Sequence, residues 1–144
     1  MNEEDILKIL KESKTIVVVG CSSNPEKAAH QVPKYMKEHG YKIIPVNPNS
    51  ENILNEKTYK SISEIKENVD IVDIFRPSEE CLDVVKEAIK LKPKVIWMQL
   101  GIINEEAKKL AEENGIKVVM DRCLMVEHRK LKDKLNSELG DVKN

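Results

Sequence analysis

The stretch that decides the fold is Val17-Val18-Val19-Gly20-Cys21-Ser22-Ser23-Asn24-Pro25-Glu26-Lys27. A β-branched run ends at Gly20, small and polar residues follow, and a helical pattern begins shortly afterwards. This order is typical of a strand–turn–helix unit that binds phosphate, because backbone N–H groups near a helix N-terminus favour an anion. Lys27 adds a mobile positive charge close to the turn. The stretch therefore predicts a site for a phosphorylated ligand just after the first strand.

The rest of the chain alternates strand-like and helix-like segments, separated by short loops. This alternation predicts a doubly wound five-stranded parallel sheet with helices on both faces. We expect one domain over residues 1–144, with a core at about 13–123 and a C-terminal helix at about 124–139. The predicted strands are 15–19, 42–46, 70–75, 94–98 and 117–120, and the predicted helices are 3–12, about 29–39, 79–91, 105–114 and 124–139.

Local signals place several helix ends. Pro33 is best tolerated in the first turn of a helix, so the second helix is expected to begin near Ala29 or His30. The segment 61–64 has the pattern of a capping box for a short helix. Ser78 and Asn104 are predicted to cap the helices that follow them.

The overall composition excludes several classes of protein. With 24 basic and 25 acidic residues the net charge is -1, which argues against a general nucleic-acid binder. No apolar run has the length of a membrane helix, and the acidic residues at positions 3–5 do not fit a signal peptide, so a cytoplasmic protein is expected. The three cysteines form no C-x-x-C pair, which argues against a zinc site and predicts reduced thiols.

The ends of the strands carry the candidate binding residues, because ligands of such sheets bind beyond the carboxyl ends of the strands. The first turn matches a G-x-G-x-x-G fingerprint only in part, with Gly20, Ser22 and Pro25 at the three positions. Asn47 follows the second strand where an NAD site would carry an acid for the ribose, which counts against NAD. Arg76 follows the third strand, where a ligand phosphate would pass.

Together these strand ends resemble those of the small stand-alone CoA-binding proteins, a Rossmann-like family related to the CoA-binding domain of succinyl-CoA synthetase. The resemblance covers roughly residues 13–130, through several motifs in the same order. The matching segments are Val19-Gly20-Cys21-Ser22 with Lys27, Gly40-Tyr41 through Pro45-Val46-Asn47-Pro48, Val72-Asp73-Ile74-Phe75-Arg76, Trp97-Met98-Gln99-Leu100-Gly101-Ile102, Asn104-Glu105-Glu106-Ala107 and Val119-Met120-Asp121-Arg122-Cys123.

The resemblance implies a site for coenzyme A, or an acyl-CoA, along the carboxyl edge of the sheet. By this analogy the turn from Gly20 to Ser23, with Cys21, Ser22 and Lys27, holds phosphates. The adenosine side is then lined by Val46, Asn47 and Pro48, the middle of the ligand is flanked by Phe75, Arg76 and Pro77, and the pantetheine arm lies near Gln99 and Gly101.

No constellation of catalytic residues stands out, so a non-enzymatic CoA-binding module is the leading interpretation. A redox-responsive variant rests on Cys21, whose thiolate the helix N-terminus and Lys27 would favour, with Cys123 as a resolving thiol. The alternative is that small residues simply fill tight spaces there. Two other functions stay open, an NAD(P)-dependent oxidoreductase and a subunit of an acyl-CoA synthetase.

The apolar positions of the C-terminal helix allow two interpretations. They either form a surface for a partner or a dimer, or they pack on the domain itself. These positions are Leu124, Val126, Leu131, Leu135 and Leu139.

Overall fold

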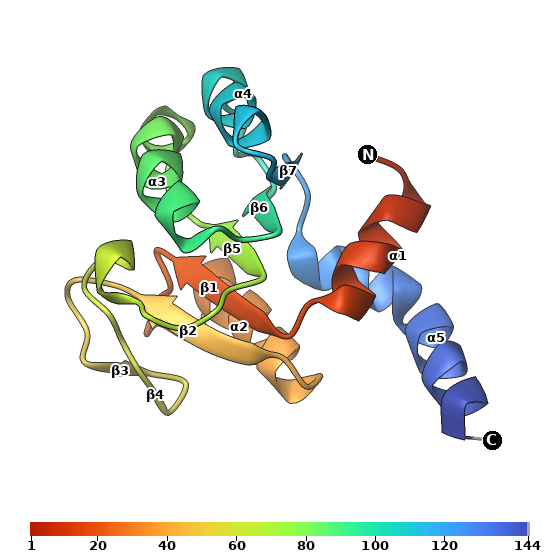
Figure 1. Ribbon diagram of the computed structural model, residues 1–144. Coiled ribbons are helices and arrows are strands. Elements are labelled where there is room, and N and C mark those ends of the chain that lie inside the picture. The colour runs from red at the N-terminus through yellow and green to blue at the C-terminus, as the bar shows by residue number, and fades with distance from the viewer. Residues whose placement is uncertain (144) are drawn as a thin grey trace.

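The computed structural model describes the backbone of residues 1–143 and the side chains of residues 1–136. Five parallel strands form one sheet in the order β2-β1-β5-β6-β7 (Figure 1). The predicted α/β fold, a Rossmann-like doubly wound parallel sheet, is confirmed. The strands are β1 Thr15–Val19, β2 Lys42–Val46, β5 Ile71–Ile74, β6 Val95–Met98 and β7 Lys117–Val119.

Helices cover both faces of this sheet. One layer holds α1, α2 and α5, and the opposite layer holds α3 and α4 (Figure 1). Three short 3-10 turns accompany them, Ile62–Glu64, Ser78–Glu80 and Ile89–Leu91. The helices are α1 Glu3–Glu12, α2 Ala28–Glu38, α3 Cys81–Ala88, α4 Glu105–Glu113 and α5 Leu124–Lys143.

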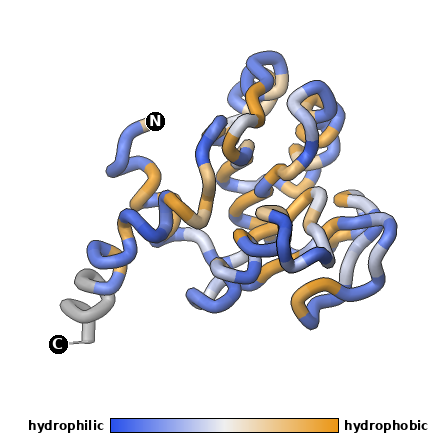
Figure 2. Tube along the Cα trace, turned by 180° about the vertical axis from the view of Figure 1, so that it is seen from behind, coloured by the Kyte–Doolittle hydropathy of each residue, from blue (hydrophilic) through white to orange (hydrophobic). Residues whose placement is uncertain are grey.

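The core consists of two apolar layers, one on each side of the sheet. Because side chains alternate along a strand, Val17 and Val19 face α3 and α4, whereas Ile16 and Val18 face α1, α2 and α5. The strands are therefore continuous apolar runs, as expected for a parallel sheet buried on both faces. Figure 2 shows the same pattern, with hydrophobic segments inside and hydrophilic turns at the periphery.

The position of Pro33 differs from the prediction. Helix α2 begins at Ala28, so Pro33 lies in the second turn rather than the first. A proline there has no N–H for the carbonyl of Ala29, four residues earlier. That carbonyl instead accepts a hydrogen bond of 3.1 Å from the N–H of Ser22. The carbonyl that Pro33 leaves without an N–H partner thus connects α2 to the turn after β1.

Two of the three predicted caps are wrong. Ser61 does not cap the turn that follows it, because its hydroxyl lies 2.8 Å from that of Ser63. The Ser78 hydroxyl accepts from the N–H of Ile103 and therefore braces the loop after β6. Asn104 does cap α4 as predicted, accepting from the N–H of Ala107 at 2.9 Å.

A small hairpin was not predicted. Strands β3 (Asn52–Ile53) and β4 (Glu56–Lys57) pair in antiparallel fashion beside β2 (Figure 1). Leu54 and Asn55 between them have φ of 55° and 62°, the positive values of a tight hairpin turn. An ion pair of 2.9 Å between Lys37 of α2 and Glu56 holds the hairpin in place.

Helix α5 packs on the domain itself over its first turns. Leu124, Leu131 and Leu135 are buried against the sheet and α1, whereas Val126 is exposed. Leu139 lies outside the residues whose side chains are described. On the same helix His128 is buried, with its Nδ1 2.9 Å from the hydroxyl of Tyr35.

Candidate functional site

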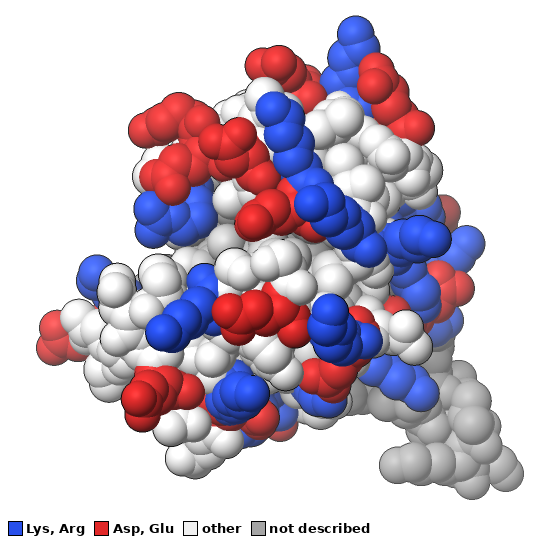
Figure 3. Space-filling model, turned by 60° about the vertical axis from the view of Figure 1, so that its left-hand side comes forward, with Lys and Arg blue, Asp and Glu red and all other residues white. Residues whose placement is uncertain are grey.

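A cavity of about 620 Å³ opens at the carboxyl ends of β1, β2 and β5. Its volume is in the range of sites for small molecules and cofactors, roughly 300–1,000 Å³. The strand order reverses here, because the chain leaves β1 toward β2 over one face and reaches β5 on the other side of β1. Figure 3 views the molecule from this side, where basic and acidic side chains lie close together around uncharged surface.

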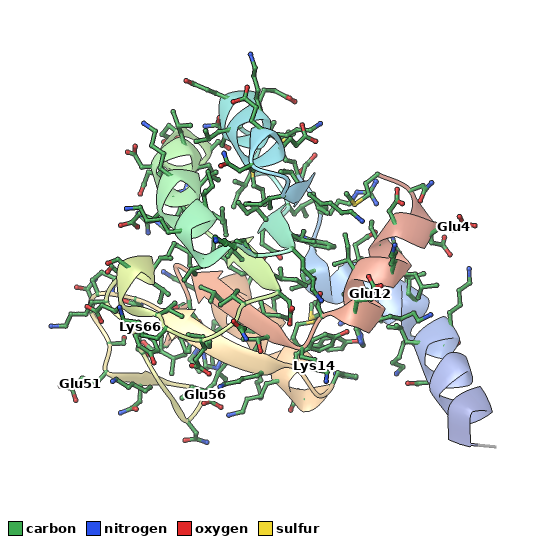
Figure 4. All side chains as sticks on the ribbon, in the orientation of Figure 1. Glu4, Glu12, Lys14, Glu51, Glu56 and Lys66 are labelled. Carbon is green, nitrogen blue, oxygen red and sulfur yellow. The ribbon has the colours of Figure 1, made fainter. Side chains whose placement is uncertain are left out.

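Most of the predicted binding residues line this cavity. They come from three strand ends that hydrogen bonds hold together, Gly20 N–H to Val46 O at 3.1 Å and Phe75 N–H to Val19 O at 2.8 Å. Lys14, the residue before β1, lies at the opposite end of that strand from this edge (Figure 4). The predicted residues around the cavity are Gly20, Cys21, Ser22, Lys27, Val46, Asn47, Pro48, Phe75 and Arg76.

The turn after β1 has a tightly fixed backbone. Gly20 has φ +84°, and a Cβ added there would lie 2.8 Å from the carbonyl oxygen of Phe75. Two hydrogen bonds to α2 hold the backbone of Ser22. Its N–H donates to Ala29 O at 3.1 Å, and its carbonyl accepts from His30 Nδ1 at 2.8 Å. Helix α2 therefore determines the shape of the turn before any ligand arrives.

The N-terminus of α2 offers donors to the cavity. Among the residues that the structure describes, the N–H groups of Ala28 and Ala29 have no acceptor. Ala29 lines the cavity, and Lys27 at the N-cap position is exposed beside it. Two free N–H groups, the helix dipole and an ammonium group together favour an anion at this point.

Asn47 braces the second strand end. Its Nδ2 donates to the carbonyl of Cys21 at 2.8 Å, and its Oδ1 accepts from the N–H of Asn49 at 2.7 Å. The side chain thus connects the ends of β1 and β2 while keeping the cavity wall neutral. A carboxylate at this position would repel a phosphorylated ribose.

Arg76 is held by a carboxylate at the third strand end. Its Nε and Nη2 donate to the carboxylate of Glu80, at 3.2 Å and 2.9 Å to Oε1, and Nη2 also lies 3.1 Å from Oε2. Both side chains line the cavity and are about half exposed. The cavity therefore has cations from three segments, namely Lys27, Lys60 and Arg76.

Several cavity residues were missed by the strand-end reasoning. Lys60 and Ser61 follow the unpredicted hairpin, so no sequence pattern placed them at this edge. Glu80, Val84 and Glu87 line the opposite wall, and their spacing of four and three residues is that of one helical face. That spacing was a usable signal. The remaining unpredicted lining residues are Val19, Ala29, Asn49 and Ile62.

Four predicted binding residues do not line the cavity: Ser23, Pro77, Gln99 and Gly101. The side chain of Gln99 is buried, and its Oε1 accepts from the N–H of Leu124 at 3.1 Å, which satisfies the N-terminus of α5. The N–H of Gly101 donates to Asp121 at 2.7 Å. The structure thus gives Gln99 and Gly101 a structural role, and their contact with a ligand stays a prediction.

The expected thiolate at Cys21 is wrong. The side chain is fully buried in the α1–α2–α5 layer, and burial, with the nearby Asp73 carboxyl, raises the pKa of Cys21 to about 12. The backbone N–H of Ser22 lowers the pKa of this thiol, but burial outweighs that effect. A mixed disulfide at Cys21 is therefore not supported, and with it the redox-responsive role loses its basis.

The Asp73 carboxyl is a second buried ionisable group, close to the Cys21 thiol. The Asp73 side chain is fully buried on β5 between Val18 and Trp97, and neither carboxyl oxygen has a hydrogen-bond partner among the described residues. Burial raises the pKa of Asp73 well above its ordinary value. Burial without a hydrogen-bond partner therefore favours the protonated form of this carboxyl.

In the described part of the chain, no group of three or more His, Cys, Asp or Glu side chains is placed to hold a metal ion. Likewise, no helix among the described residues is long and apolar enough to cross a membrane.

The chain is similar to several known proteins over most of its length. The chain is 42% identical over 127 residues to the Uncharacterized protein YneT of Bacillus subtilis, covering 88% of this chain and 94% of that protein. It resembles the structure of cell-free ID.343 from Thermus thermophilus, with a TM-score of 0.87, 43% identity and coverage of 91% and 99%.

Larger enzymes contain a similar segment. The chain is 30% identical over 120 residues to subunit alpha of the ADP-forming acetate–CoA ligase II of Pyrococcus furiosus. The match covers 76% of this chain but only 26% of that subunit. Residues 14–129 match the family described as CoA binding domain, and this chain therefore belongs to that family.

Proposed function

We propose that this protein binds coenzyme A in the cavity at the carboxyl edge of the sheet. The observation that carries the proposal is that a cavity with three cations and a helix N-terminus lies inside the segment that matches the CoA-binding family. Coenzyme A carries a pyrophosphate and a 3′-phosphate, and such groups bind well to N–H donors and guanidinium or ammonium groups. The donor set of the cavity therefore fits this ligand.

Different groups of cavity residues would bind different parts of the ligand. The N–H groups of Ala28 and Ala29, with Lys27, would hold phosphate at the turn. Val46, the neutral Asn47 and Pro48 would line the adenosine side, and Phe75 offers a flat apolar surface beside them. Within the described residues the cavity shows no nucleophile paired with a base, so we propose a binding module rather than a catalyst.

Calorimetric titration of ligand-stripped protein with CoA tests this proposal, with NAD as the control ligand. We expect saturable CoA binding in the micromolar range or tighter, and no heat from NAD. Lys27→Gln should weaken CoA binding by about tenfold, because it removes a cation from the turn. The matched control Lys34→Gln, on an exposed position of α2 outside the cavity, should not. Absence of CoA binding, or equal binding of NAD, would overturn the proposal.

The ligase relatives favour a second candidate role, as the CoA-binding part of an acyl-CoA synthetase. The chain spans about a quarter of the Pyrococcus furiosus subunit, so in this role it would supply only the CoA site of the reaction. An assay of ADP release with acetate, CoA and ATP tests this role when the chain is added to a ligase that lacks the matching segment. Release that requires both would favour the ligase role over a simple binding module, and no release would speak against it.

A further inference from the structure

The cavity carries opposed charges on its two sides. Lys27, Lys60 and Arg76 are basic, whereas Glu80 and Glu87 place carboxylates along the wall formed by α3 and the turn before it. A phosphorylated ligand is attracted by the first group and repelled by the second. Arg76 and Glu80 belong to opposite groups and are bound to each other.

Their geometry is that of a guanidinium that holds an oxyanion. The stem of Arg76 crosses the turn after β1, since its Cδ lies 3.0 Å from the position of a Cβ on Gly20. The guanidinium then points two nitrogens at the Glu80 carboxylate, at 2.9 to 3.2 Å. Arg binds phosphate oxygens through this same planar arrangement of N–H groups.

We propose that Glu80 is a specificity-determining residue, which competes with the ligand phosphate for Arg76. This inference rests on the proposed function, because it concerns the same cavity. The carboxylate occupies the donors that a phosphate needs, so binding requires the phosphate to displace Glu80. A phosphate group with more negative charge than a carboxylate can do so, whereas a singly charged or neutral ligand gains nothing from Arg76. Glu80 thus lowers affinity while raising selectivity for phosphorylated ligands.

A purely structural ion pair is the competing explanation. The pair is exposed on both sides, with side chains 45% and 46% accessible, and such pairs contribute little to stability. Removal of the carboxylate should therefore leave the fold intact. A structural role predicts that ligand affinity is unchanged or lower, whereas competition predicts that it rises.

The test compares CoA affinity in matched variants by calorimetry. Glu80→Gln should bind CoA about threefold to fivefold more tightly than the wild type, the effect that an exposed ion pair can have. Glu79→Gln is the control, because it removes the same charge from the adjacent residue, which does not line the cavity. Its affinity should equal that of the wild type.

A double-variant cycle shows whether the gain depends on Arg76. Arg76→Gln should weaken CoA binding, and adding Glu80→Gln to it should give a smaller gain than Glu80→Gln gives in the wild type, because only the loss of general repulsion remains. Glu87→Gln, which removes a cavity carboxylate outside the pair, should have the same effect with and without Arg76. The inference is overturned if Glu80→Gln matches Glu79→Gln, or if its full gain persists without Arg76.

A second measurement separates this inference from the proposed function. Arg76 is one of three arginines, so its Nε–H signal in a nitrogen–proton NMR spectrum can be assigned with Arg76→Lys. Titration with inorganic pyrophosphate should shift this signal, at lower concentrations in Glu80→Gln than in Glu79→Gln. If CoA does not bind but pyrophosphate shifts the Arg76 signal as expected, only the proposed ligand is refuted and the competition stands. An Arg76 signal that pyrophosphate leaves unmoved in both variants would refute the competition.

Discussion

At the scale of single residues, Gly20 determines how closely the ends of β1 and β5 approach. We expect Gly20→Ala to lower the free energy of unfolding by about 2–4 kcal/mol, because its φ is positive and the new Cβ would lie 2.8 Å from Phe75 O. Gly101→Ala is the control, since its φ is also positive but nothing lies within 4 Å of its Cβ. It should cost about 1 kcal/mol. Urea denaturation measures both, and equal losses would contradict this account.

The three cysteines should differ in reactivity. Cys21 and Cys81 are fully buried, and burial raises their pKa to about 12 and about 11. Cys123 is partly exposed. We therefore expect iodoacetamide at pH 8 to alkylate Cys123 at least about tenfold faster than the other two. Mass spectrometry of timed samples measures this, with protein in denaturant as the control in which all three react. Rapid alkylation of native Cys21 would restore the thiolate hypothesis.

At the scale of elements, α2 and the turn before it form one unit through Pro33. In Pro33→Ala a new N–H competes for the carbonyl of Ala29, which now accepts from Ser22. We expect the amide of Ser22 to exchange its hydrogen about threefold to tenfold faster, because it shares its acceptor. Lys34→Ala, at the next position of the same helix, should leave this exchange unchanged. Unaltered Ser22 exchange in Pro33→Ala would show that the proline does not hold the turn.

The elements of the sheet were predictable because their signals are local. Continuous apolar runs such as 15–19 mark strands buried on both faces, and the helical periodicity between them is equally clear. The β3–β4 hairpin gave no such signal, since Leu54 takes a left-handed conformation that its residue type disfavours. Ser78 has the residue type of a helix cap, but its hydroxyl accepts a hydrogen bond from the N–H of Ile103, which is distant in the sequence.

The candidate site could be predicted only where it consists of strand ends. A parallel sheet brings all its carboxyl ends to one edge, so Gly20, Asn47 and Arg76 could be placed together from topology. Lys60 reaches the cavity by way of the hairpin, and Glu80 through the turn before α3, which no strand-end rule covers. The charge state of Cys21 also depends on tertiary burial, which the neighbouring sequence does not reveal.

At the scale of the whole molecule, stability should depend on pH through His128. Burial, with His39 and Lys132 nearby, lowers the pKa of His128 from 6.5 to about 4, and Tyr35 and Tyr41 enclose its ring. Between these two values the unfolded chain binds a proton and the folded chain does not. The contribution of His128 to stability is therefore complete above about pH 6.5 and falls as the pH drops toward 4, by up to about 3 kcal/mol.

Replacement of His128 tests this dependence. We expect His128→Gln to have a flatter profile of unfolding free energy between pH 4 and 6.5 than the wild type, measured by urea denaturation. Its stability at pH 7 will be lower, because the contact with Tyr35 changes, so the slope rather than the level is compared. His30→Gln, at a histidine that does not contribute to the pKa shift of His128, should retain the wild-type slope. A His128→Gln profile as steep as the wild type would assign the dependence to other groups.

Asp73 adds the uptake of a proton to the folding reaction, opposite in sign to the proton release at His128. The unfolded carboxyl is ionised above about pH 4, whereas the buried one is protonated up to its raised pKa. Between these limits the buffer supplies that proton, and its own heat of ionisation enters the measured heat of folding. The dependence of the calorimetric enthalpy on the buffer will thus differ between the wild type and Asp73→Asn at one pH, by up to the heat of ionisation for one proton. Part of the measured heat of folding then comes from ionisation of the buffer and not from the protein.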